Sequence, residues 1–193
     1  MKQPIYYTPI QLQTLVERGV VLPDSEAVHI ATDVVLERIS ATATLHPGTR
    51  ISGIKTTIGA QVEIGLCGPA TLEDAEVGDG AVVGSLGPVT LCRTTVGPHS
   101  VLGSGVAEDC VFLGKETQLN DFTTGYGFRV RKGSLYEEDA STAQHTDTKM
   151  TILFPWVTLG SNSNLCDLLI SGGNGPELGH FTEVGSGTIH FNF

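Results

Sequence analysis

The stretch Thr57–Gly103 decides the fold, and it reads TIGAQVEIGLCGPATLEDAEVGDGAVVGSLGPVTLCRTTVGPHSVLG. Aliphatic residues followed by glycine recur in it at a constant interval, slightly longer than three hexapeptides. They form two series: Ile58, Val77 and Val96, and, one hexapeptide behind, Ile64, Val83 and Leu102. A period of about six within a period of about 18 is typical of hexapeptide repeats. The sequence therefore predicts an all-β fold, a single-stranded parallel β-helix whose inward aliphatic side chains stack in columns.

The series extend back to Ile39 and Leu45, so we expect the β-helix to occupy residues 28–193, after a helix and lead-in at residues 1–27. Thr8 can serve as the N-cap of this helix, Pro9 suits its first position, and Gly19 suits its end. Its apolar residues are Ile10, Leu12, Leu15 and Val16. Because a stack of coils needs a cap, we expect the helix to cover one open end.

The repeat pattern breaks at about residues 115–156, which predicts one long inserted loop. This segment holds five of the chain's 11 basic residues, namely Lys115, Arg129, Arg131, Lys132 and Lys149. Two interpretations stay open. The segment is either an ordinary solvated loop or an anion site, since clustered Arg and Lys side chains suit phosphate recognition.

Periodicity resumes after the break. Leu178 follows Leu159 at the interval of the earlier series, and Val184 follows Leu165 at the same interval, which predicts that each pair stacks in consecutive coils. The pattern then runs to Phe193 without a closing helix. This end favours a fragment of a longer polypeptide over a chain whose last coil is covered by a partner.

The composition excludes some partners. A formal net charge of −10 argues against nucleic acid and against an anionic membrane surface, because both are bound through Lys and Arg. The four cysteines show no CxxC spacing and lie in repeat segments, so we expect most of them to be buried thiols. There is no charged-then-apolar leader and no apolar run long enough to span a bilayer, which favours a cytoplasmic location.

Two motifs carry a resemblance to a known family. The C-terminal run at 184–193, VGSGTIHFNF, resembles the aliphatic-Gly-Ala-Gly-Thr-Ile-x-x-Asn-Tyr run of the bifunctional uridyltransferase/glucosamine-1-phosphate acetyltransferase. The run at 129–133, RVRKG, resembles that family's Arg-Leu-Arg-Pro-Gly. In the family a substrate-binding lysine follows the second arginine, and Lys149 follows Arg131 at the same spacing.

The resemblance implies a left-handed β-helix that forms a homotrimer, with acetyl-CoA or another acyl-CoA in the groove between subunits. It implies that Arg131 and Lys149 hold the phosphate of a sugar phosphate or sugar nucleotide such as UDP-N-acetylglucosamine. By the same resemblance Asn192 contacts the acceptor sugar and Ser186 lies along the path of the coenzyme. No metal is implied.

The chain also departs from the family. Asp167 stands where the family has its catalytic histidine, and Ile170 stands where it has a tyrosine. The nucleotidyltransferase domain and its glycine-rich loop have no counterpart in this sequence. Acyl transfer to an amine needs a base, for which histidine is the usual choice. The candidates are Asp167 and His180. His180 follows Leu178 at the same distance as Asp167 follows Leu165, so both side chains are expected to point outward. The alternative for His180 is an exposed histidine without a role.

Two functions therefore stay open. One is an acyltransferase that moves an acyl group from coenzyme A to an amino-sugar phosphate or nucleotide. The other is a non-catalytic, trimerising module that binds a sugar nucleotide. A γ-class carbonic anhydrase is a remote third, because His145 and His180 lack a closely following third ligand and position 185 is glycine. His190, one hexapeptide past Val184, is expected to point inward as a core histidine.

Overall fold

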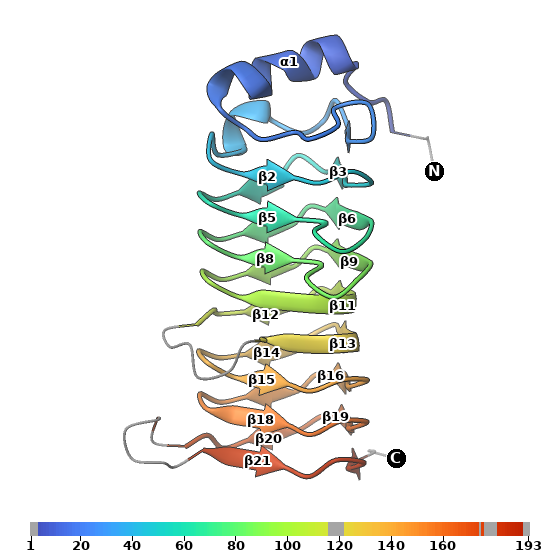
Figure 1. Ribbon diagram of the computed structural model, residues 1–193. Helices are drawn as coiled ribbons and strands as arrows, with labels where there is room; N and C mark the ends of the chain where they lie inside the picture. The colour runs from blue at the N-terminus through green and yellow to red at the C-terminus, as the bar shows by residue number, and fades with distance from the viewer. Residues whose placement is uncertain (1–3, 116–121, 174, 176–180, 191–193) are drawn as a thin grey trace.

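The computed structural model describes residues 4–115, 122–173, 175 and 181–190, and in it the chain winds into a parallel β-helix of about seven turns (Figure 1). As seen in Figure 1, the chain crosses the front from left to right, returns behind and descends, so the coils wind left-handed. Parallel crossovers are almost always right-handed elsewhere. The predicted β-helix is confirmed, and the stack sits beneath a single α-helix.

That helix, α1 (Pro9–Arg18), covers the N-terminal end of the stack (Figure 1). The Thr8 side chain accepts a hydrogen bond from the Gln11 amide, and Gly19 ends the helix at a φ of 107°. Leu12 and Leu15 are fully buried against the first coils, whereas Ile10 is 85% exposed. The predicted caps are confirmed, but the apolar face is narrower than expected, because only two of its four residues are buried. A short 3₁₀ helix, η1 (Leu36–Arg38), follows in the first coil.

Each coil has three flat faces. They are named A, B and C in the order in which the chain passes through them within a coil. Face A contains β1 (His29–Ile30), β3 (Arg50–Ser52), β6 (Ala70–Glu73), β9 (Val89–Cys92), β16 (Asp147–Lys149), β19 (Asn164–Cys166) and β22 (Ile189–His190). Face B contains β4 (Thr57–Ile58), β7 (Glu76–Val77), β10 (Thr95–Val96), β12 (Val111–Phe112), β14 (Leu135–Tyr136), β17 (Ile152–Leu153) and β20 (Leu169–Ile170). Face C contains β2 (Thr44–Leu45), β5 (Glu63–Ile64), β8 (Val82–Val83), β15 (Ser141–Thr142), β18 (Val157–Leu159) and β21 (Thr182–Val184). Two longer strands, β11 (Val101–Glu108) and β13 (Thr124–Arg131), begin on face C and end on face A.

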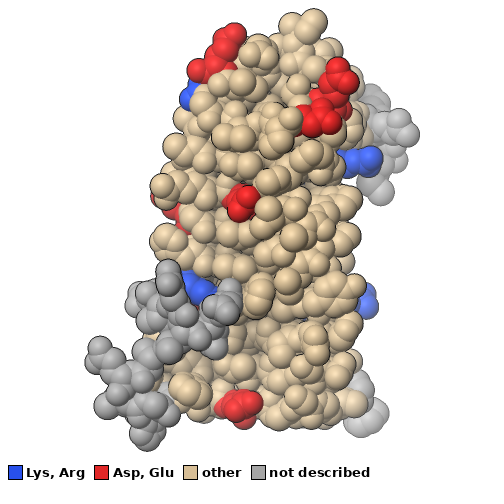
Figure 2. Space-filling view, viewed as in Figure 1, with Lys and Arg blue, Asp and Glu red and all other residues tan. Residues whose placement is uncertain are grey.

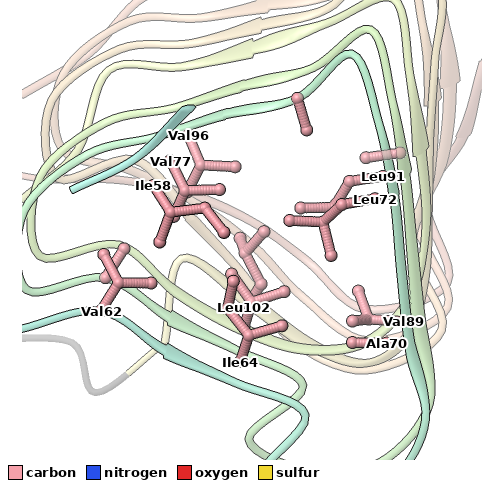
Figure 3. Packing of buried hydrophobic residues seen from close by; sticks show 14 of the residues in the cluster. Ile58, Val62, Ile64, Ala70, Leu72, Val77, Val89, Leu91, Val96 and Leu102 are labelled. Carbon is pink, nitrogen blue, oxygen red and sulfur yellow. The ribbon is translucent and has the colours of Figure 1, made fainter. Parts of the chain in front are cut away.

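The two predicted aliphatic series are confirmed as two columns of the core (Figure 3). On face B, Ile39, Ile58, Val77 and Val96 are register partners in successive coils. On face C, Leu45, Ile64, Val83 and Leu102 are partners in the same way. All eight are at most 3% exposed. Burial of each such side chain stabilises the fold by about 1.5–3 kcal/mol, so the columns hold the coils together.

The interruption is much shorter than the predicted loop at 115–156. Strands β13, β14, β15, β16 and β17 all lie within that range and pair with neighbouring coils. The pattern escaped prediction because three inward positions here are Thr124, Thr142 and Thr148 rather than aliphatic residues, and Tyr136 takes another on face B. The actual insertion lies between β12 and β13.

A second insertion lies between β20 and β21, where none was predicted (Figure 1). Val184 is the register partner of Leu159 and not of Leu165. Leu165 instead pairs with His190, whose Nδ1 lies 2.9 Å from the Cys166 carbonyl oxygen. The predicted stacking of Leu165 on Val184 is therefore wrong. His190 does take the inward position expected of it, and Leu178 lies outside the described residues.

The cysteines are less buried than expected. Only Cys110 is buried, whereas Cys67 is exposed and Cys92 and Cys166 are half-buried. Burial raises the pKa of the Cys110 thiol to about 12. The repeat pattern located the cysteines in the coils but did not distinguish inward from outward positions near the corners.

Candidate anion-binding site on face A

The two strands that carry the predicted phosphate ligands lie side by side on face A. Strand β13 pairs with β16 in parallel, and Arg131 is the register partner of Lys149. Val130 and Thr148, the preceding residues, are buried in the core, so Arg131 and Lys149 point to the outside of the coil. The chain completes one coil between the two residues. The structure therefore brings Arg131 and Lys149 together.

Both residues line a pocket of about 290 Å³ on the outside of face A. The other lining residues are Val106, Glu108, Asp109, Arg129, Val130 and Lys132. The lining thus contains four cationic side chains and two carboxylates. The pocket therefore carries net positive charge, although the chain as a whole is acidic. Charged residues are sparse on the face of the molecule that Figure 2 displays.

Asp147 and Cys166 fix the orientation of the Arg131 guanidinium. Its Nε donates to Asp147 Oδ1 at 2.8 Å, and its Nη2 lies 3.8 Å from Cys166 Sγ. The Arg131 side chain is about one-third exposed. An arginine held in this way presents a planar fork of donors, which suits a phosphate group better than a free side chain does.

The other three cations of the pocket take part in no ion pair within the described part of the chain. Among the described residues, Arg129, Lys132 and Lys149 form no salt bridge. Each is exposed. An ordinary solvated face would also show exposed cations, but here three of them and Arg131 converge on one concave surface. This convergence favours the anion-site interpretation of the basic segment.

Asp167, the candidate base, lies at the corner where face A meets face B. It follows β19 directly, has a φ of 56°, and donates its backbone N–H to the Lys149 carbonyl oxygen at 3.0 Å. Its side chain is exposed. Asp167 is therefore one coil below Lys149 and at the same end of face A. Ile170, which stands where the family that the sequence resembles has a tyrosine, packs against the core from face B.

Ser186 lies at the opposite end of face A. It is exposed in the corner between β21 and β22, and a Cβ atom built on Gly160 would lie 2.8 Å from its Oγ atom. The structure therefore separates Ser186 from the pair Arg131 and Lys149 by the width of the face. His180 and Asn192 lie outside the described residues.

Three residues of the site were missed by the sequence analysis. Arg93, one coil above the pocket, donates from Nη2 to Glu108 Oε1 at 2.7 Å and from Nε to Asp109 Oδ1 at 2.6 Å. The Arg93 hydrogen bonds, and more weakly the charge of Lys132, hold the pKa of Asp109 below its usual value. The insertion before β13 hid these residues, because it separates Glu108 from Arg131 by more than one regular repeat in the sequence.

No metal site or membrane-spanning helix is present in the described part of the chain. No group of three or more His, Cys, Asp or Glu residues there is placed to hold a metal ion. None of its helices has the length and apolar character needed to cross a bilayer. Comparison of the sequence with protein-family models and with curated proteins found no match.

Proposed function

We propose that this chain binds a phosphate-bearing sugar, either a sugar phosphate or a sugar nucleotide, in the pocket on face A. The cross-strand register of Arg131 and Lys149 carries the proposal, because it sets the two cations of the family-like motifs on adjacent strands of one concave surface. Strands in a sheet are about 4.8 Å apart, so one phosphate group can contact both side chains. The positive charge of the pocket attracts it, although the chain as a whole is acidic.

Calorimetric titration with UDP-N-acetylglucosamine and with glucosamine-1-phosphate tests the proposal. Lys149→Ala or Arg131→Ala should weaken binding by about tenfold or more, since a hydrogen bond to a charged group contributes about 1.5–3 kcal/mol. Lys55→Ala is the matched control, because Lys55 is an exposed cation of an upper coil. Binding that both pocket variants leave unchanged would contradict the proposal.

Acyl transfer from a coenzyme A thioester is the second candidate function. The position of Asp167 favours it, because this carboxylate lies one coil from Lys149 at the same end of face A. In this reaction the sugar amine attacks the thioester carbonyl, the C–N bond forms and the C–S bond breaks. Asp167, or His180 in the role of the related family's histidine, would take the amine proton, and the thiolate leaves as free coenzyme A. Ser186 would lie along the coenzyme, and Asn192 would orient the acceptor.

Release of thiol from acetyl-CoA in the presence of glucosamine-1-phosphate measures this reaction. Asp167→Asn removes the basic oxygen at nearly constant shape, and we expect it to reduce turnover by roughly 10²-fold or more. The same variant should leave calorimetric binding of the sugar nucleotide within a fewfold of the parent. Binding without thiol release by the parent would select the non-catalytic module.

We further propose a homotrimer, as the family resemblance implies, with contacts on the outside of face B. The outward column there changes from Thr57, Glu76 and Thr95 in the upper coils to Val111, Leu135, Ile152 and Leu169 in the lower ones. Leu169 is 69% exposed. Copies of an acidic chain repel one another, so they have to meet on a surface with little charge. The lower part of face B is such a surface.

Sedimentation equilibrium tests the trimer. Ile152→Glu on the outward column should convert trimers to monomers, because three carboxylates would have to be buried together. Thr57→Glu, at the corresponding position of an upper coil, is the matched control and should leave the mass unchanged. A parent that sediments as a monomer would refute the trimer and leave the anion site as proposed.

A further inference from the structure

Arg93 occupies a backbone conformation that is unusual for arginine. It is the corner residue after β9 and has a φ of 48°. The equivalent corner is occupied by Gly53, Asp74, Asp109, Met150 and Asp167 in other coils, all with positive φ. Glycine and aspartate tolerate this left-handed region, whereas a long side chain rarely adopts it. Because Met150 has this conformation at the same corner of a lower coil, the contacts of the Arg93 side chain, and not its backbone alone, set Arg93 apart.

The Arg93 side chain binds both carboxylates of the pocket. Its Nη2 donates to Glu108 Oε1 at 2.7 Å and to Asp109 Oδ2 at 3.0 Å, and its Nε donates to Asp109 Oδ1 at 2.6 Å. Arg93 itself does not line the pocket, whereas Glu108 and Asp109 do. One guanidinium therefore binds both negative groups that border the proposed anion site and offsets part of their charge.

Without Arg93, these carboxylates would turn to the pocket cations. Ala107 and Val130 are register partners, so Glu108 and Arg131, the next residues along β11 and β13, are neighbours across the two strands. Opposite charges at neighbouring positions of paired strands attract each other. Lys132 already interacts electrostatically with Asp109. Released carboxylates would compete with a phosphate for Arg131 and Lys132.

We propose that Arg93 is a positioning residue of the anion pocket, which holds Glu108 and Asp109, offsets part of their negative charge and so keeps Arg131 and Lys132 available to the ligand. The proposal rests on the anion site proposed above. It assigns to Arg93 no contact with the ligand.

The test is calorimetric titration of the full chain with inorganic pyrophosphate, a probe that needs no sugar-binding residues. Arg93→Gln keeps the strained backbone and much of the side-chain length but removes the charge, and we expect it to weaken binding roughly three- to tenfold. Adding Glu108→Gln and Asp109→Asn to this variant should restore binding to at least the parent level. Arg93→Lys should fall between, because an ammonium group cannot bridge the two carboxylates as a planar fork does.

Rescue separates positioning from a merely structural role, because removing two more charged groups does not repair a damaged fold. Thermal melting of each variant monitors the fold directly. The loss in Arg93→Gln should also shrink in 1 M salt, where the screening length falls to about 3 Å. Unchanged affinity of Arg93→Gln, or a loss that the triple variant does not restore, would overturn the role of Arg93. If Lys149→Ala still weakens binding in that case, the proposed function survives. A parent that does not bind pyrophosphate would refute both.

Discussion

The coils of residues 57–103 and those of residues 124–159 share one architecture but have different cores. In the first region, the three inward columns are filled with Ile, Val, Leu and Ala. In the second, Tyr136 takes an inward position on face B, and threonines replace aliphatic residues at some inward positions of faces C and A, namely Thr124, Thr142 and Thr148. The cross-section of the coil stays filled because a large aromatic ring is balanced by small side chains opposite it.

The two regions also differ in how regularly their coils repeat along the sequence. The regular coils repeat at a constant spacing on faces B and C. On face B the step from Val96 to Phe112 is shorter than that spacing, and the step from Phe112 to Tyr136 is longer. Arg131 and Lys149 lie in the irregular region, and the residues that pair with Arg93 lie at its edge. Where the spacing of the coils is irregular, successive coils can present different outward side chains. The regular region forms a uniform stack, and the irregular region carries the residues of the proposed anion site.

The largest expected effect is in the regular core. Ile64 and Thr142 belong to the same inward column of face C, in the first and second region respectively. Ile64→Ala removes a fully buried aliphatic side chain and should lower the free energy of unfolding by about 2–5 kcal/mol. Thr142→Ala removes one methyl and a hydroxyl that accepts from Thr146, and should cost about 1–2 kcal/mol. Denaturant unfolding measures both.

Ile54→Ala is the control for this pair, since Ile54 is 63% exposed, and its effect should stay within about 0.5 kcal/mol. Equal losses for Ile64→Ala and Thr142→Ala would contradict the distinction between the two cores.

The second-largest expected loss of stability comes from a substitution at a glycine of the regular region. A Cβ atom on Gly97 would overlap the Leu113 carbonyl oxygen in the next coil. Gly97→Ala should therefore destabilise by about 1–3 kcal/mol, because backbone atoms have to move. Gly185→Ala is the matched control: no atom of the described residues lies within 4 Å of its added Cβ. A melting temperature for Gly97→Ala equal to that of the control would show that neighbouring coils separate easily.

The regular region could be predicted well because its aliphatic inward positions repeat at a fixed interval. Prediction failed in the second region for a physical reason. Threonine fits inward when its hydroxyl finds a partner, so Thr142 and Thr148 look polar in the sequence but are buried in the core. The predicted loop at 115–156 followed from that ambiguity. The insertion before β21 was missed because Val184 follows Leu165 at the regular interval although it pairs with Leu159.

The site was predicted in part. The sequence paired Arg131 with Lys149 only through the family resemblance, and in the structure the two residues are register partners one coil apart. Arg93, Glu108 and Asp109 could not be placed, because the insertion between β12 and β13 changes the register that links them to Arg131. Side-chain direction at a corner depends on local φ, which the repeat pattern does not specify.

A third prediction concerns the hydrogen bond at the centre of the second core. The Tyr136 hydroxyl lies 2.9 Å from Thr148 Oγ1, and both side chains are fully buried. Tyr136→Phe keeps the ring and removes this bond, and it should cost about 1–2 kcal/mol in unfolding free energy. Tyr126→Phe is the matched control, because Tyr126 is 49% exposed, and it should be nearly neutral. An equally neutral Tyr136→Phe would mean that the polar core contributes no stability through this pair.

The smallest expected effect has the opposite sign. Thr124 is fully buried between Leu102 and Thr142 in the inward column of face C, and its Oγ1 has no hydrogen-bond partner in the described structure. A buried hydroxyl without a partner keeps its desolvation cost, whereas a methyl group of similar size does not. Thr124→Val should therefore raise the free energy of unfolding by about 0.5–1.5 kcal/mol, measured by denaturant unfolding. Thr142→Val, which loses the bond from Thr146, should be destabilising instead. If both substitutions destabilise to the same extent, the threonines of this column are retained for packing shape and not through their hydrogen bonds.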